Sequence, residues 1–189
     1  MSATLILGGA RSGKSALAER LAMASGRDVV VIATAAVRAG DAEMAARIAH
    51  HRERRPATWL TVETPLALAD AIRRAAAPGR LVLVDCLTVW LANLLFSDGA
   101  DHPDTGVIAL PARLNDEREA LLAVLAEVEG DLVLVANETG LGIVPLGAIN
   151  RAFVDEAGRL NQAVAAACDN AVFVAAGLPL VLKGTLPPV

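Results

Sequence analysis

Short apolar runs recur along the chain, separated by longer segments in which apolar and polar residues mix. The runs lie at residues 5–7, 29–33, 81–85, 132–136 and 171–175. Each is rich in leucine and β-branched residues and is apolar at consecutive rather than alternate positions. This pattern is typical of strands that are covered on both faces. We therefore predict five buried strands.

The segments between these runs have the composition of helices, and they predict the fold class. We expect helices at residues 14–24, 41–55, 65–76, 87–96, 112–129 and 147–168. Strands that alternate with helices indicate an α/β fold with a mostly parallel sheet flanked by helices. We expect a single domain over residues 1–189, with a surface loop at 97–106. After a turn at 177–179, residues 180–183 are predicted to form a short antiparallel edge strand at the C-terminus.

Composition narrows the class of protein. The chain has 189 residues, of which 54% are apolar, enough for one domain with a substantial core. A net charge of −4 argues against a nucleic-acid partner. The apolar stretch 81–96 is interrupted by Asp85, Thr88 and Asn93, which argues against membrane insertion. Two cysteines far apart and a start without signal-peptide features favour the reducing cytoplasm.

A phosphate-binding loop lies between the first predicted strand and the first predicted helix. Its residues are Gly8, Gly9, Ala10, Arg11, Ser12, Gly13, Lys14 and Ser15. The glycines let successive backbone N–H groups turn toward phosphate oxygens, and the following helix adds the positive end of its dipole. We expect Lys14 to reach the β- and γ-phosphates of a nucleoside triphosphate, and the Ser15 hydroxyl to ligate Mg²⁺. A glycine turn with a chance lysine would need all these positions to coincide, and only two lysines occur in the chain.

An acid on a neighbouring strand should complete the metal side of such a site. Asp85 closes the run 81–85, which would deliver its carboxylate to the carboxyl edge of the sheet. The alternative role for Asp85 is the N-cap of the next helix. Glu138, which follows the run 132–136, is a second candidate with weaker support.

Two adjacent histidines, His50 and His51, lie inside the predicted helix 41–55. His51 shares a helix face with Ile48 and is expected to pack. His50 shares the other face with arginines, where an anionic phosphate could dock and where an imidazole could attack phosphorus. Geometry alone favours the simpler interpretation, a solvated helix face with ordinary charges.

Taken together, these segments resemble the bifunctional adenosylcobinamide kinase / adenosylcobinamide-phosphate guanylyltransferase family, nearly from end to end. The histidine segment and the segment 137–145 are more particular than the phosphate loop, which many families share. Only the loop 97–106 and Ala35 depart from the pattern. The segments that carry the resemblance are 8–15, 32–34, 41–56, 86–88 with 93–95, 137–145, 155–162 and 177–183.

The resemblance implies two reactions at one nucleotide site. The enzyme would phosphorylate adenosylcobinamide, a corrinoid, with ATP or GTP. It would then transfer GMP from GTP to give adenosylcobinamide-GDP and pyrophosphate. The family's covalently guanylylated histidine corresponds to His50, and a homotrimer is implied. The family's GTP contacts correspond to residues 8–15, Ala33, Thr34, Ala35, His51, Arg52, Glu53, Arg54, Glu63 and Asp85.

Two rival hypotheses remain open from the sequence. One is a simple kinase of a small metabolite, in which both histidines are structural. The other is a nucleotide-dependent switch that binds partner proteins and turns over slowly. Covalent labelling of the protein by GTP separates the first rival from the transferase, and a corrinoid-dependent product separates the second.

Overall fold

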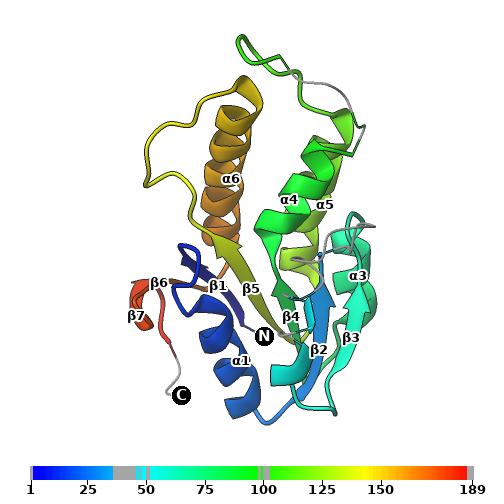
Figure 1. Cartoon of the computed structure of the whole chain (residues 1–189). Coiled ribbons are helices and arrows are strands. Elements are labelled where there is room, and N and C mark those ends of the chain that lie inside the picture. The colour runs from blue at the N-terminus through cyan, green and yellow to red at the C-terminus, as the bar shows by residue number, and fades with distance from the viewer. Residues whose placement is uncertain are drawn as a thin grey trace.

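The computed structural model describes residues 2–35, 46, 48–49, 52–97, 99 and 103–186. Helices and strands alternate along the chain, as the sequence predicts (Figure 1). In chain order the elements are β1 (Ala3–Gly8), α1 (Lys14–Ala24), β2 (Asp28–Ala33), β3 (Leu60–Glu63), α3 (Leu68–Ala75), β4 (Arg80–Asp85), α4 (Leu87–Leu95), α5 (Ala112–Glu127), β5 (Asp131–Asn137), α6 (Ala148–Ala167), β6 (Asn170–Ala175) and β7 (Leu178–Lys183).

The described strands form one sheet in the order β3-β2-β4-β5-β1-β6-β7. All neighbouring strands in it are parallel except β6 and β7, which are antiparallel. The predicted class, a mostly parallel sheet flanked by helices with an antiparallel strand at its C-terminal edge, is therefore confirmed. In this order β1 lies inside the sheet, so the segment that follows it starts from a buried strand.

Both faces of the central strands β1, β2, β4 and β5 are buried, which explains their consecutive apolar residues. In β1, Leu5 and Leu7 join the core beneath α3, α4, α5 and α6, whereas Ile6 joins the core beneath α1. Figure 1 shows α1, in blue, apart from the green and gold helices α4, α5 and α6. Because side chains alternate along a strand, covering both faces requires apolar residues at every position.

Element bounds differ from the prediction at a few places. Strand β3 was not predicted, because two of its four residues are exposed, the other two are only half-buried, and the strand lies at the sheet edge beside β2. Strand β7 begins two residues earlier than predicted, directly after a turn at Ala176 and Gly177, both of which have positive φ. Within the predicted helix 41–55, the described residues 46, 48–49 and 52–54 are helical.

The loop predicted at 97–106 contains no helix or strand in its described residues. Within the part of the chain that the structure describes, no helix combines the length and the apolar character needed to cross a bilayer. The sheet, with its helices on both faces, is thus the structural framework of the described chain.

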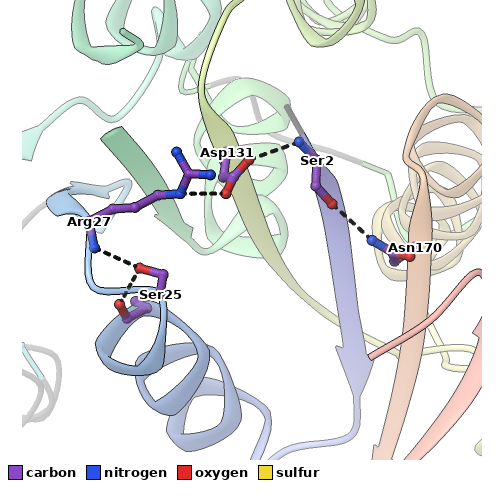
Figure 2. Close-up of polar contacts among 6 residues, drawn as sticks. Ser2, Ser25, Arg27, Asp131 and Asn170 are labelled. Carbon is purple, nitrogen blue, oxygen red and sulfur yellow. Dashed lines mark hydrogen bonds and ion pairs between the residues drawn. The ribbon is translucent and has the colours of Figure 1, made fainter. Parts of the chain in front are cut away.

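At the amino edge of the sheet, Asp131 joins three segments that are far apart in the sequence (Figure 2). One carboxylate oxygen accepts a hydrogen bond from the backbone N–H of Ser2 at 2.9 Å, and the other pairs with Nε of Arg27 at 2.8 Å. Asn170 in turn donates from Nδ2 to Oγ of Ser2 at 3.0 Å. These contacts fix the starts of β1, β5 and β6, at the edge opposite to the carboxyl ends of the strands.

Candidate active site

A cavity of about 560 Å³ opens at the carboxyl edge of the sheet. Ligands of open α/β sheets bind at this edge, because the loops that leave the strands diverge there. The wall combines the loop after β1, the ends of β2, β4 and β5, and residues of the histidine segment. The lining residues are Ala10, Arg11, Ser12, Gly13, Lys14, Ser15, Ala16, Ala33, Ala35, Ile48, Arg52, Arg54, Arg55, Thr61, Asp85, Cys86, Val89 and Asn137.

The loop after β1 is held in shape by close backbone contacts. A side chain at Gly8 would place its Cβ only 2.5 Å from Oγ of Ser12. Gly13 has φ of +98°, which favours glycine, and a Cβ there would lie 3.1 Å from Cα of Gly177. The backbone N–H of Gly177, in the β6–β7 turn, donates to the carbonyl of Ser12 at 2.8 Å. The β6–β7 hairpin therefore packs against the glycine loop and stabilises its conformation.

Lys14 begins α1, and its ammonium group lies at the cavity wall. Its Nζ donates a hydrogen bond to the carbonyl of Gly9 at 3.0 Å. Burial lowers the pKa of Lys14 from its ordinary value, while Cys86 and Asp85 act in the opposite direction. The first turn of α1 also leaves backbone N–H groups without partners inside the helix. A cation and free donors at one helix start make this wall suited to phosphate.

Asp85 and Ser15 line the same cavity and supply oxygen donors. Mg²⁺ in nucleotide enzymes commonly uses one or two carboxylates together with substrate phosphates and water. Among the described residues, no group of three or more His, Cys, Asp or Glu side chains gathers into a metal site. The donors present thus fit a Mg²⁺ ion held jointly with a triphosphate rather than by a cage of protein ligands.

Three arginines end the histidine segment, and each pairs with a carboxylate on a different element. The partners lie on β3, on α1 and on β4, so the arginines connect this segment to the wall of the cavity. The pairs are Arg52 with Glu63, Arg54 with Glu19 at 2.9 Å, and Arg55 with Asp85 at 3.2 Å.

A buried polar network joins the ends of β2 and β4. The Thr34 hydroxyl donates to the Cys86 carbonyl at 2.8 Å and accepts from the Cys86 N–H at 3.0 Å. Asn93 on α4 donates from Nδ2 to the Thr34 carbonyl at 2.8 Å. Burial raises the pKa of the Cys86 thiol to about 11, so this cysteine is protonated at neutral pH and is a poor nucleophile.

The residues expected from the sequence fall into three groups. Residues 10–15, Ala33, Ala35, Arg52, Arg54 and Asp85 all line the cavity. Other expected nucleotide contacts do not line the cavity: Thr34 is fully buried, Glu53 is exposed, and Glu63 pairs with Arg52.

Glu138, the second candidate acid, accepts a hydrogen bond from the N–H of Gly140. His50 and His51 lie outside the described residues.

Several lining residues were not expected from the sequence, among them Arg55 and Asn137. Asn137 ends β5, and its position directly after a predicted strand was an available signal. Arg55 belongs to an arginine-rich segment, and nothing in the residue pattern distinguishes it from its neighbours. Its place on the wall depends on contact with Asp85, which is 30 residues away in the chain.

Comparison with known families identifies relatives over nearly the whole chain. The family model described as cobinamide kinase / cobinamide phosphate guanyltransferase matches residues 4–182. The bifunctional adenosylcobalamin biosynthesis protein CobP of Pseudomonas aeruginosa is 58% identical over 180 residues, covering 95% of this chain and 96% of the relative. The corresponding protein CobU of Escherichia coli is 42% identical over 181 residues, covering 95% and 98%.

Solved structures share the fold at low sequence identity. A prototypical ATPase of a bacterial type III secretion system aligns with a TM-score of 0.53 and 15% identity, over 91% of this chain and 50% of that chain. The RadB recombinase aligns with a TM-score of 0.51 and 13% identity, over 99% and 83%. At these identities the likeness describes the arrangement of strands and helices alone.

Proposed function

Because the chain belongs to the cobinamide kinase / cobinamide phosphate guanyltransferase family, we propose that it catalyses both reactions at the cavity described above. It phosphorylates adenosylcobinamide with ATP or GTP, and then transfers GMP from GTP to the product. The observation that supports this most directly is the cavity itself, which Lys14, Ser15 and Asp85 line together with residues of the glycine loop. The relative that is 58% identical is named as a bifunctional adenosylcobalamin biosynthesis protein.

In the kinase step, the loop and Lys14 bind the β- and γ-phosphates. An alcohol oxygen of adenosylcobinamide attacks the γ-phosphorus, the bond from that phosphorus to the bridging oxygen breaks, the nucleoside diphosphate leaves, and the alcohol proton is released to water. The N–H groups of the loop and the ammonium of Lys14 stabilise the negative charge that develops on the phosphate oxygens. Ser15 and Asp85 would hold Mg²⁺, which when bound neutralises part of this charge.

In the guanylyl step, we assign the nucleophile to His50. An imidazole nitrogen attacks the α-phosphorus of GTP, an N–P bond forms, and pyrophosphate leaves. A phosphate oxygen of adenosylcobinamide phosphate then attacks the same phosphorus, the N–P bond breaks, and adenosylcobinamide-GDP is formed. The assignment rests on the family resemblance. It is supported by Ile48 and Arg52, described neighbours of His50 in the chain that line the cavity.

Labelling with GTP that is radioactive at the α-phosphate tests this function. We expect the wild-type protein to retain label in a form that is stable to base and labile to acid, as a phosphoramidate is. His50→Ala should remove the label and guanylyl transfer while the kinase reaction stays measurable. His51→Ala is the matched control and should keep the label. Label retained in His50→Ala and lost in His51→Ala would reverse the assignment, and an unlabelled wild type would leave only a kinase.

The same resemblance leads us to propose a single P-loop domain that acts in the cytoplasm as a homotrimer. Sedimentation equilibrium tests the oligomer, since a trimer has three times the 19.5 kDa mass of the chain. A mass of one or two chains at working concentrations would contradict it.

A further inference from the structure

One guanidinium on the cavity wall is buried with unused hydrogen-bonding capacity. The side chain of Arg55 is only 7% exposed, and it lines the cavity. Its Nη2 atom donates to Oδ2 of Asp85 at 3.2 Å. Its Nε atom is buried and has no hydrogen-bond partner in the described part of the chain. A second donor on the same wall, Oγ of Ser12, is also buried and has no hydrogen-bond partner among the residues that the structure describes.

A buried hydrogen-bond donor lowers the stability of the folded protein unless an acceptor binds it. A guanidinium carries five N–H donors. The neighbouring Arg52 and Arg54 differ in this respect, because their side chains are 58% and 40% exposed and can also bond to water. Nε of Arg55 and Oγ of Ser12 therefore lack an acceptor among the described residues, and the oxygens of a bound phosphate would supply one.

We propose that Arg55 is a further ligand of the triphosphate, and that Asp85 orients its guanidinium toward the terminal phosphates. This inference rests on the proposed function, in which a triphosphate occupies the cavity. Lys14, which reaches the β- and γ-phosphates in loops of this kind, lines the cavity together with Asp85 and Arg55. Arg55, paired with the same Asp85, is thus at the end of the cavity that receives the terminal phosphates. A planar guanidinium suits phosphate because it can bind two oxygens at once.

The test compares binding of GTP, GDP and GMP by calorimetry, without divalent cations, so that any metal held by Asp85 does not contribute. We expect Arg55→Met to weaken GTP binding by about 10- to 100-fold, as for the loss of charge-assisted hydrogen bonds. GMP binding should change by less than about threefold, because GMP lacks the terminal phosphates. Arg55→Lys keeps the positive charge but loses the planar guanidinium that can bind two oxygens at once. It should weaken GTP binding by an intermediate factor.

The matched control is Arg27→Met, which removes an arginine paired with an aspartate at the opposite edge of the sheet. It should leave all three affinities unchanged. Equal weakening of GTP, GDP and GMP in Arg55→Met, or no weakening, would overturn the inference. If Arg55→Met does not fold, the ratio of GTP to GMP affinity in Arg55→Lys decides in the same way. A wild type that fails to bind GTP would instead overturn the proposed function, and this inference with it.

Discussion

Lys14 is held as a cation in surroundings that disfavour a cation. Its side chain is buried at the start of α1, and the hydrogen bond described for its ammonium goes to the neutral carbonyl of Gly9. The lowered pKa of Lys14 expresses the same cost, because burial favours the uncharged amine. A bound phosphate would offset that cost. At this residue, therefore, stability without nucleotide and affinity for nucleotide oppose each other.

We predict that Lys14→Met raises the melting temperature of the nucleotide-free protein and weakens GTP binding by more than about tenfold. Thermal unfolding and calorimetry on the same samples measure both effects. A melting temperature that falls, together with unchanged affinity, would contradict this account of Lys14.

The pH dependence of Lys14 follows from the direction of its pKa shift. Because the folded pKa lies below the usual 10.5, GTP affinity should begin to fall at a lower pH than that value implies. Between the folded pKa and 10.5, the unfolded chain binds a proton that the folded chain lacks. Stability without nucleotide should therefore rise with pH across that window, and this dependence should be absent in Lys14→Met.

At the scale of whole elements, Lys183 of β7 ends helix α6. Its Nζ donates to the carbonyls of Ala165 at 3.1 Å and Ala166 at 2.9 Å, and also to that of Cys168. The last carbonyls of a helix have no partners within it, and a cation there also complements the helix dipole. One side chain thus attaches the edge strand to the longest described helix.

We predict that Lys183→Met lowers the free energy of unfolding by about 1–2 kcal/mol, because the helix end loses a charged donor. In a chain of this size, that corresponds to a fall of roughly 2–8 °C in melting temperature. Lys183→Arg is the control and should recover part of the loss. GTP affinity should stay unchanged, since Lys183 lies at the end of β7 remote from Gly177. A melting temperature equal to that of wild type would contradict this role.

The sequence predicts those helices and strands whose own residue pattern shows that they are buried. The strands β1, β2, β4, β5 and β6 each contain a run of consecutive apolar residues, so they were found. Strand β3 has only four residues, two of them exposed and two half-buried, and its pairing with β2 depends on tertiary contact. The glycine loop was predicted because its phosphate-binding residues are consecutive in the sequence. Arg55 was not predicted as a site residue, because its role depends on Asp85, which only folding brings into contact with it.

At the scale of the molecule, the two edges of the sheet serve different purposes. The carboxyl ends of the strands surround the cavity, whereas the amino ends are joined by the contacts of Asp131 with Ser2 and Arg27. Binding groups and stabilising groups are therefore separated by the length of the strands. Changes at one edge should act on affinity, and changes at the other on stability.

We predict that Asp131→Ala lowers the free energy of unfolding by about 1–3 kcal/mol while leaving GTP affinity unchanged. The alanine leaves the N–H of Ser2 without its acceptor and Arg27 without its counter-ion. Asp131→Asn can still accept from Ser2 and should cost less. Thermal unfolding and calorimetry measure the two effects, and a loss of GTP affinity in a folded Asp131→Ala protein would show that the edges are coupled.

The place of β1 inside the sheet also determines when a newly made chain can acquire its activity. Ser2 bonds to a residue 129 positions later, and Ala3 to a residue 166 positions later. The phosphate loop is therefore translated well before β5 and β6, the two strands that flank β1 in the sheet. Until those strands are made, the nascent chain exposes an apolar strand without partners, a period in which chaperones protect against aggregation. We expect nucleotide to stabilise the chain only once β5 and β6 have joined β1.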